Sequence, residues 1–342
     1  MEHATVLEKN ILRRWKDDEE LASIPLDVKE HFGAPFAVIY RADLQRILLD
    51  AAIGCGCKIL KGHEVLDSDE KFLPLILVRS RGTETWISAD LVLAADGMNS
   101  IVRKRMAEAS DQVDQLVPTR GSAYRFLLPK ELSMRYIGPG IHIMGYPLRN
   151  NTLYNVVLVR EAENAKCRET SWATQAKKEE ILEYCRGWCP VIQALTRYAP
   201  SSGILETPMN ILPPLPTWVK GQTALAGDAC HYMLPYVAQG AANAIEDAGT
   251  LAIAFTCTDN IELALGMYQL IRKDRSERIQ VNGEEQRRRD DSIRAASRGL
   301  GTNPDQWSDR RSREFMWRVD VIAETINKFN SLARGVGINK GG

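Results

Sequence analysis

The segment from Leu225 to Asp247 reads LAGDACHYMLPYVAQGAANAIED and is the most informative stretch of this 342-residue chain. Small apolar residues lead into Gly227-Asp228, a turn carries Pro235, and an alanine-rich run typical of a helix follows. A strand, a turn and a helix start in this order present backbone N–H groups and the positive end of a helix dipole to an anionic ligand. The segment therefore predicts an α/β fold with a ligand site at this turn.

A second stretch also has an acidic residue and a glycine directly after an apolar run. The apolar run over residues 91–95 has the composition of a buried parallel strand, and it ends at Asp96-Gly97. Asn99 or Ser100 can cap the helix that follows. An acid and a glycine directly after a buried strand lie where α/β sheets bind their ligands. Asp96 can accept hydrogen bonds from ligand hydroxyls, and Gly97 allows a close approach of the backbone.

A third stretch combines a short strand over residues 36–40 with a helix over residues 42–52. Arg41 stands between them, at the start of the helix. A guanidinium stays charged and can fork two hydrogen bonds toward the oxygens of a ligand. Taken alone, an arginine in this place is more often a partner in a surface salt bridge.

These three stretches, in this order and spacing, resemble the flavin-dependent aromatic hydroxylases, the family of para-hydroxybenzoate and salicylate hydroxylases. The resemblance extends over nearly the whole chain. It implies an α/β fold, in which a Rossmann-like domain binds FAD and NAD(P) and carries an inserted mixed-sheet substrate domain. FAD would be the cofactor and NADPH or NADH the reductant.

The resemblance also implies roles for individual residues. Asp228 would accept hydrogen bonds from the ribityl chain, and Pro235 would shape the loop near the flavin ring. The helix that starts at Gly240 would favour negative charge at the pyrimidine edge of the flavin. In the substrate domain, Arg125 and Tyr146 are the candidate catalytic residues, and Tyr154 is a further candidate for the active-site face. The complete set of expected FAD-binding residues is Arg41, Asp96, Gly97, Asp228, Pro235, Gly240, Ala241 and Asn243.

The implied reaction is the hydroxylation of an aromatic or related electron-rich small molecule, in secondary metabolism or aromatic catabolism. In that reaction NAD(P)H reduces the flavin, O2 adds to it, and the resulting flavin hydroperoxide delivers one oxygen atom. The protein would contribute positioning, a dry cavity and electrostatics. Oxygen-independent chemistry on the same fold is the alternative among the enzymes.

The expected domain boundaries follow changes in the sequence pattern. Residues 1–109 are expected to form the first, incomplete part of the FAD-binding domain, 110–215 the substrate domain, 216–300 the second part of the FAD-binding domain, and 301–342 a helical tail. Residues 1–33 are predicted to begin as a charged helix and to continue as a loop. Further predictions are strands over 73–78, 85–87, 121–128, 141–146 and 154–159, and helices over 101–109, 177–198, 240–254 and 261–290.

The sequence contains no G-x-G-x-x-G turn, although the family would open with one inside a βαβ unit of at least roughly 30 residues. That turn would hold the cofactor pyrophosphate on a helix N-terminus. The chain is therefore expected to be a truncated product or a degenerate member that binds flavin weakly or not at all. A non-catalytic remnant that acts as a binding or interaction protein is the alternative function.

Composition argues against several other classes of protein. Lys plus Arg and Asp plus Glu both number 44, so the net charge is zero and no nucleic-acid partner is expected. Seven cysteines without metal-ligand spacing predict free thiols and no metal site. His231 is expected to be a structural histidine, because no partner for catalysis or metal binding is visible in the sequence.

No apolar run approaches the ~20 residues that a membrane span requires, and the first ten residues lack a secretory signal. The sequence therefore predicts a soluble cytoplasmic protein that acts on a small molecule. It does not indicate an oligomeric state.

Overall fold

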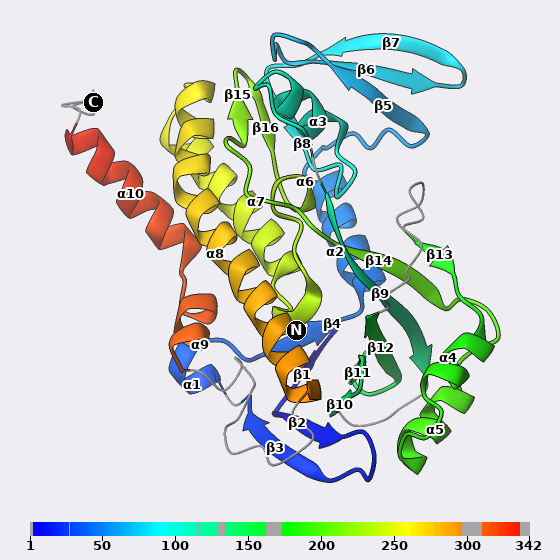
Figure 1. Cartoon of the computed structure of the whole chain (residues 1–342). Helices are drawn as coiled ribbons and strands as arrows, with labels where there is room; N and C mark the ends of the chain where they lie inside the picture. Colours follow the sequence, from blue (N-terminus) through cyan, green and yellow to red (C-terminus); the bar gives the residue numbers. More distant parts are fainter. Residues whose placement is uncertain are drawn as a thin grey trace. The chain divides into compact units, whose positions relative to one another are not determined.

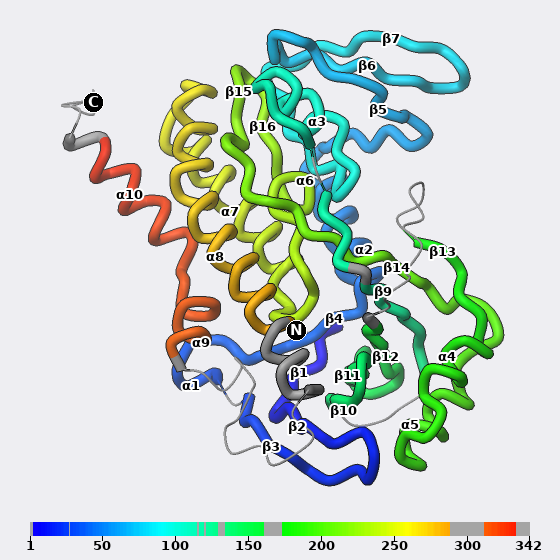
Figure 2. Tube along the Cα trace, viewed as in Figure 1, coloured from blue at the N-terminus to red at the C-terminus, as the bar shows by residue number. Residues whose placement is uncertain are grey.

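The computed structural model describes residues 3–26, 28–114, 116–128, 134–161, 173–295 and 310–335 (Figures 1 and 2). Contacts divide the chain into two compact units. Unit 1 comprises Met1–Ile59, Pro118–Asn210 and Arg287–Arg310, and unit 2 comprises Leu60–Val117, Ile211–Gln286 and Arg311–Gly342. Each unit therefore combines segments that are far apart in the sequence.

Unit 1 contains an eight-stranded mixed sheet with the strand order β13-β14-β9-β12-β11-β10-β2-β3. β2 pairs parallel with β10, whereas the pairs β2–β3, β10–β11, β11–β12 and β12–β9 are antiparallel. The three strands predicted between residues 121 and 159 are confirmed as β9, β11 and β12. The strand bounds are β2 (Lys9–Arg14), β3 (Glu20–Pro25), β9 (Val117–Leu128), β10 (Met134–Gly138), β11 (Ile141–Leu148), β12 (Leu153–Glu161), β13 (Thr174–Gln175) and β14 (Leu205–Ile211).

The remaining elements of unit 1 are short except for one helix. β1 (Ala4–Val6) and β4 (Ala37–Ile39) form an antiparallel pair. The helices are α1 (Lys29–Phe32), α2 (Arg41–Gly54), α4 (Lys178–Tyr184) and α5 (Pro190–Arg197). The single helix predicted over 177–198 is therefore wrong. Gly187 has a φ of 80°, and Pro190 can begin a helix but cannot continue one, so the chain forms two helices.

The two faces of the eight-stranded sheet differ in polarity. Tyr124, Phe126 and Leu128 alternate along β9 on the buried face, where the core also includes Ile181 of α4 and Ile192 of α5. The residues between them on β9 project to the opposite face, because successive side chains of a strand alternate. That opposite face carries half-buried side chains such as Arg125 and Tyr146 together with fully buried ones such as Ala123 and His142.

The helix predicted at the beginning of residues 1–33 is wrong. These residues form β1, β2 and β3, with only the short α1 near the end. In β2, Ile11 and Leu12 are both buried although they point to opposite faces, so both faces of the sheet are covered at this strand. Tertiary pairing with a strand more than 100 residues away has overridden the local helical preference.

The observed grouping also differs from the expected domain boundaries. Residues 1–109 were expected to act as one part of the FAD-binding domain, yet Met1–Ile59 packs in unit 1 and Leu60–Val117 in unit 2. The physical reason is the parallel pairing of β2 with β10, which makes the N-terminal strands part of the mixed sheet.

Unit 2 contains two three-stranded sheets. One has the order β15-β16-β8 and comprises β8 (Val92–Ala94), β15 (Val219–Lys220) and β16 (Thr223–Leu225). The other is an antiparallel sheet of β5 (His63–Ser68), β6 (Leu75–Ser80) and β7 (Thr83–Ser88). The predicted strand over 91–95 is confirmed as β8, which pairs parallel with β16. The expected burial of this run is wrong, since Leu93 is 45% exposed and Ala95 is also exposed.

The helices of unit 2 include the two long helices predicted from the sequence. They are α7 (Gly240–Cys257) and α8 (Ile261–Ala295), and the predicted helix over 101–109 is α3 (Ile101–Glu108). The shorter elements are α6 (Asp228–His231), the 3-10 helix η1 (Pro235–Val237), α9 (Arg310–Trp317) and α10 (Val321–Gly335). α7 and α8 lie side by side and are joined by buried side-chain hydrogen bonds (Figure 1). The core between these helices and the β15-β16-β8 sheet includes Trp218, Leu251 and Tyr268.

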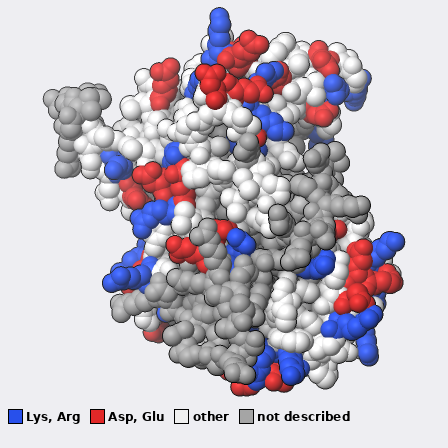
Figure 3. Space-filling model, in the orientation of Figure 1, with Lys and Arg blue, Asp and Glu red and all other residues white. Residues whose placement is uncertain are grey.

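Positive and negative side chains are intermixed on the face shown in Figure 3, as the zero net charge leads one to expect. Among the described residues, no helix is both long enough and apolar enough to cross a membrane.

Candidate functional site

Two of the predicted motifs meet at one edge of a sheet in unit 2. β8 and β16 are neighbouring parallel strands, and the Ala226 N–H continues the ladder by donating to the Ala94 carbonyl at 2.9 Å. Asp96 follows the end of β8, and Asp228 follows the end of β16. Both carboxylates are exposed. The carboxyl ends of parallel strands therefore bring two exposed acids to the place where α/β sheets bind ligands.

The turn at Gly227 requires glycine because of its backbone conformation. Its φ of 62° and ψ of −142° belong to a region that side-chain-bearing residues essentially do not occupy. A Cβ atom at this position would lie 3.5 Å from the Ala244 Cβ, so the turn also packs closely on α7. The turn leads directly into α6, where Asp228 is the first residue.

The Asp96-Gly97 turn leads into α3 and has a different requirement. Gly97 has a φ of 79°, and no atom lies within 4 Å of the position that its Cβ would take. One oxygen of Asp96 accepts a hydrogen bond from the Ile101 N–H at 2.8 Å, and Ser100 caps α3 by accepting from the Arg103 N–H at 3.0 Å. The cap expected at Asn99 or Ser100 is thus at Ser100. Asp96 supports the helix start with one oxygen and keeps the other available for a ligand.

The start of α7 presents backbone groups rather than side chains. Gly240 is half-buried and Ala241 is exposed, and the first N–H groups of a helix have no intrahelical acceptor. Asn243, by contrast, is buried, and its Oδ1 accepts hydrogen bonds from Arg272 Nη2 at 2.8 Å and from Ser276 Oγ at 3.0 Å. The Asn243 side chain therefore supports the helix start from inside the protein.

Pro235 lies between the Gly227-Asp228 turn and α7. It is exposed and begins η1, after an extended Leu234. Its ring fixes φ, which restricts the conformations of this loop.

Beneath these motifs lies a buried polar cluster that the sequence did not reveal. Asp247 Oδ2 accepts hydrogen bonds from the Gly227 N–H at 2.9 Å and from His231 Nε2 at 2.6 Å, and its Oδ1 accepts from Arg272 Nε at 2.9 Å. The side chains of His231, Asp247 and Arg272 are all 1% exposed or less. His231 is a structural histidine as predicted, and its partner is Asp247.

The cluster keeps Asp247 ionised. Burial alone would raise the pKa of this carboxyl, but the hydrogen bond from His231, the charge of Arg272 and the Gly227 N–H together lower the pKa below its ordinary value. Glu246 extends the cluster by pairing with both Arg272 and Arg275. The two carboxylates of Glu246 and Asp247 thereby balance the charges of Arg272 and Arg275.

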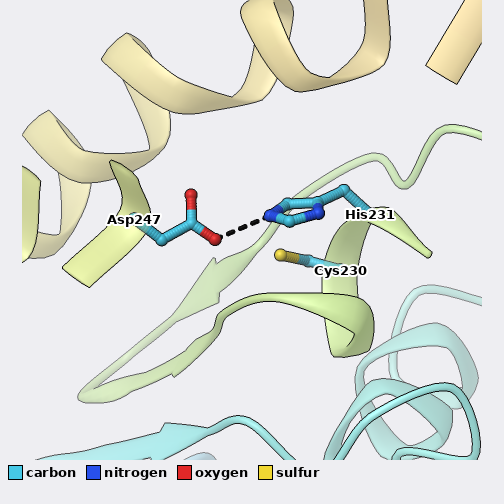
Figure 4. A group of neighbouring side chains, drawn as sticks. All are labelled: Cys230, His231 and Asp247. Carbon is cyan, nitrogen blue, oxygen red and sulfur yellow. Dashed lines mark hydrogen bonds and ion pairs between the residues drawn. The ribbon is translucent and has the colours of Figure 1, made fainter. Parts of the chain in front are cut away.

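Within the described part of the chain, Cys230, His231 and Asp247 form a group whose potential metal ligands lie within 4.8 Å of one another (Figure 4). Their chemistry does not fit a metal ion. The Asp247 carboxylate already accepts from Gly227, His231 and the Arg272 cation, and burial raises the pKa of the Cys230 thiol well above its ordinary value. The three side chains therefore form part of the packed interior.

Arg103 links the two motif turns and was also missed in the sequence. It is 1% exposed, and its guanidinium donates to the Met98 carbonyl at 2.6 Å and to the Ala229 carbonyl at 3.2 Å. It also forms a two-pronged pair with Asp114 at 2.8 and 3.1 Å. Met98 follows Asp96-Gly97 and Ala229 follows Gly227-Asp228, so one buried cation holds both turns.

In unit 1, Arg41 is the first residue of α2 and is exposed. The neighbouring Asp43 is buried and accepts two hydrogen bonds from Arg149, at 2.7 and 2.8 Å. These hydrogen bonds lower the pKa of the Asp43 carboxyl. Arg149 also stacks on the Tyr40 ring at 4.8 Å, so the start of α2 is fixed to the loop after β11.

Arg125 and Tyr146 lie on the same face of the eight-stranded sheet. Arg125 pairs with Val157 and Tyr146 with Asn155, both on β12 between them, so the two side chains share the face opposite the core. Both are half-buried, and Arg125 donates to Thr207 Oγ1 at 2.9 Å. Burial raises the pKa of Tyr146, while the Arg125 charge and a hydrogen bond with Asn155 act in the opposite direction. Of the predicted site residues, the structure thus gathers Arg125 and Tyr146 in unit 1 and the Asp-Gly and Gly-Asp motifs in unit 2. The prediction for Tyr154 is wrong: it pairs with Leu128 on the core face of the sheet and is 1% exposed.

Comparisons with known proteins agree with these features. A family model described as an FAD binding domain matches residues 5–279. The FAD-dependent monooxygenase atnJ of Arthrinium sp is 34% identical over 317 residues, which cover 84% of this chain and 73% of that protein. The 6-hydroxynicotinate 3-monooxygenase of Bordetella bronchiseptica is 31% identical over 280 residues, covering 78% of this chain and 70% of the relative.

Solved structures show the same fold. A salicylate hydroxylase in complex with substrate superimposes with a TM-score of 0.74 at 20% identity, covering 95% of this chain and 84% of the other. CtdE in complex with FAD and substrate gives a TM-score of 0.77 at 18% identity, covering 97% and 83%. From the family match and the relatives more than 30% identical, we conclude that this chain belongs to the family of FAD-dependent aromatic monooxygenases.

Proposed function

We propose that this FAD-dependent monooxygenase hydroxylates an aromatic or related electron-rich small molecule and uses NADPH or NADH as the reductant. FAD, when bound, supplies the chemistry that activates O2. The observation that carries the proposal is the sheet edge in unit 2, where two exposed carboxylates follow neighbouring parallel strands. The start of α7 packs directly on one of the two turns.

The residues at this edge fit the polar parts of FAD. Asp96 and Asp228 offer carboxylate oxygens to the hydroxyls of the ribityl chain or ribose, and the space around Gly97 allows a ligand to approach the backbone. The free N–H groups and the dipole of α7 favour negative charge next to Gly240 and Ala241. Pro235 would shape the loop near the flavin ring. In unit 1, the exposed Arg41 would donate to phosphate or ribityl oxygens.

Arg125 and Tyr146 would bind the substrate. A half-buried guanidinium next to a phenol on a partly apolar sheet face suits a ring that carries a carboxylate or hydroxyl group. Relatives include proteins named 6-hydroxynicotinate 3-monooxygenase and 3-hydroxybenzoate 6-hydroxylase, which support hydroxylated aromatic acids as the first compounds to test.

The first experiment measures FAD binding by the purified 342-residue chain, from visible absorbance and a fluorescence titration. Binding followed by substrate-dependent NADPH or NADH oxidation and a hydroxylated product would support the proposal. The sequence contains no G-x-G-x-x-G turn. A folded chain that binds no FAD would therefore favour the alternative, a non-catalytic binding or interaction protein.

Two substitutions test the assigned FAD contacts. Asp228→Ala and Arg41→Ala should each weaken FAD binding by about tenfold or more, because each removes a charge-assisted hydrogen bond. Asp259→Ala, at an exposed acid of unit 2, and Arg46→Ala, at an exposed arginine of α2, are the matched controls and should leave the affinity unchanged. Equal affinities in all four variants would refute the site assignment.

A further inference from the structure

Asp247 is a buried residue in direct contact with the turn that carries Asp228. Its carboxylate accepts the Gly227 N–H at 2.9 Å, and the same oxygen accepts His231 Nε2 at 2.6 Å. Gly227 directly precedes α6 and His231 is its last residue, so Asp247 holds the residue before Asp228 and the residue three positions after it. Asp228 itself is exposed at the beginning of this short helix.

The turn needs such an anchor because glycine has the largest conformational freedom of any residue. Gly227 adopts a φ of 62° and a ψ of −142°, and a flexible glycine leaves this conformation unless its surroundings hold it there. Within the buried cluster, the Gly227 N–H is bonded to the Asp247 carboxylate. An ionised carboxylate can only accept hydrogen bonds, so His231 Nε2 must be the donor.

We propose that Asp247, assisted by His231, is a positioning residue for the flavin site. It holds Gly227 in the observed backbone conformation and thereby fixes the position of the exposed Asp228 at the sheet edge. Arg272 completes the anchor by donating to the second carboxylate oxygen at 2.9 Å. The expected effect on FAD binding rests on the proposed function. The anchoring of the turn does not, because it is a property of the protein without ligand.

The neighbouring acid provides a matched control. Glu246 also pairs with Arg272, and Glu246→Gln removes the same charge as Asp247→Asn, but Glu246 makes no hydrogen bond to the turn among the described contacts. In Asp247→Asn, the new amide NH2 group must face either Arg272 or the Gly227 and His231 donors. In Glu246→Gln, the new NH2 group can face only Arg272 or Arg275, so the Gly227 and His231 donors keep their acceptor.

The experiment compares amide hydrogen exchange of residues 226–233 in the ligand-free 342-residue chain with FAD affinity in the same preparations. We expect Asp247→Asn to raise exchange in this segment, and the Kd for FAD, by about tenfold or more. Because Glu246→Gln also weakens the pairs of the buried Arg272 and Arg275, exchange in residues 226–233 is compared with exchange in the rest of each variant. Relative to that reference, Glu246→Gln should change exchange in the segment by less than about threefold. Equal exchange in the two variants would overturn the proposal.

A second pair of variants applies if Asp247→Asn does not fold. His231→Gln keeps an N–H near the position of Nε2, whereas His231→Leu removes it. The leucine variant should loosen the turn and weaken FAD binding, and the glutamine variant should stay close to the wild type. Indistinguishable behaviour of these two would also overturn the proposal. If the wild-type chain binds no FAD, the proposed function fails, while the exchange data still decide whether Asp247 anchors the turn.

Discussion

Backbone conformation, not side-chain chemistry, requires glycine at position 227. We expect Gly227→Ala to reduce the free energy of unfolding by about 1–3 kcal/mol, the usual cost of a side chain held in this region of φ and ψ. Gly266 is the matched control, because it is exposed within α8 and its Cβ would meet no atom within 4 Å. Gly266→Ala should stabilise the protein by up to about 1 kcal/mol. Urea denaturation measures both, and equal midpoints for the two variants would contradict this account.

The ionisation of Asp247 makes part of the stability dependent on pH. A carboxyl whose pKa is lowered by folding contributes stability above its unfolded pKa, about 3.9, and loses it as the pH falls through the lower folded value. We expect Asp247→Asn to cost about 3–5 kcal/mol at neutral pH, as is usual when one partner of a buried ion pair is removed. The difference in Tm between wild type and variant should shrink below about pH 4. A difference undiminished at about pH 3 would argue against an ionised Asp247.

At the level of single residues, the sequence predicted which residues follow a strand better than it predicted which side chains hydrogen-bond to one another. Asp96, Gly97 and Asp228 could be placed because each directly follows an apolar strand, and this relation is visible within a few residues. The role of Asp247 could not be predicted, because its donor Arg272 lies 25 residues further along the chain on another helix. Glu246 and Asp247 are equivalent in sequence, and only the packing of α7 decides which acid contacts the turn.

Among the elements, α9 is fixed to unit 2 by one arginine. Arg275 donates to the carbonyls of Phe315 and Met316 at 2.7 and 3.1 Å, where the last turn of α9 leaves carbonyls without helical partners. Met316 is buried in a cluster with Met233 and Val237, which belong to the loop around Pro235. α9 therefore braces the loop expected to lie near the flavin ring.

Removing the hydrogen bonds from Arg275 to the end of α9 should have a measurable effect. Arg275→Leu is expected to destabilise the packing of α9 by about 3–5 kcal/mol, since it leaves Glu246 without one of its buried cations. Limited proteolysis should then cut within residues 310–317. Arg278→Leu is the control, because Arg278 is exposed and stacks on the Phe315 ring at 4.1 Å. Cleavage at equal rates in both variants would assign the brace to ring stacking.

Local signals account for which elements the sequence predicted correctly. The helices over 240–254 and 261–290 and the strand over 91–95 have their own periodicity or apolar run, and all three are present. β2 and β3 were predicted as helix and loop because their charged residues give no alternating pattern. β2 is a strand because it pairs with β3 on one edge and with the distant β10 (residues 134–138) on the other.

For the whole molecule, the two units explain why the domain boundaries were hard to predict. The chain passes from one unit to the other near residues 59, 117 and 210, and again in its C-terminal part. Motifs show what a segment binds, but not with which distant segment it packs. The assignment of residues 1–109 to a single domain followed family order along the chain, whereas the contacts follow the sheet.

The place of β2 between β10 and β3 has a consequence during synthesis. The β2–β3 hairpin leaves the ribosome long before its other neighbour exists, since β10 begins about 120 residues after β2 ends. At a translation rate of about 5–20 residues per second, the hairpin waits roughly 6–24 s with one edge unpaired. Throughout that interval the nascent chain exposes Ile11 and Leu12 on an open strand, so we expect this hairpin to need protection from pairing with other chains until β10 is made.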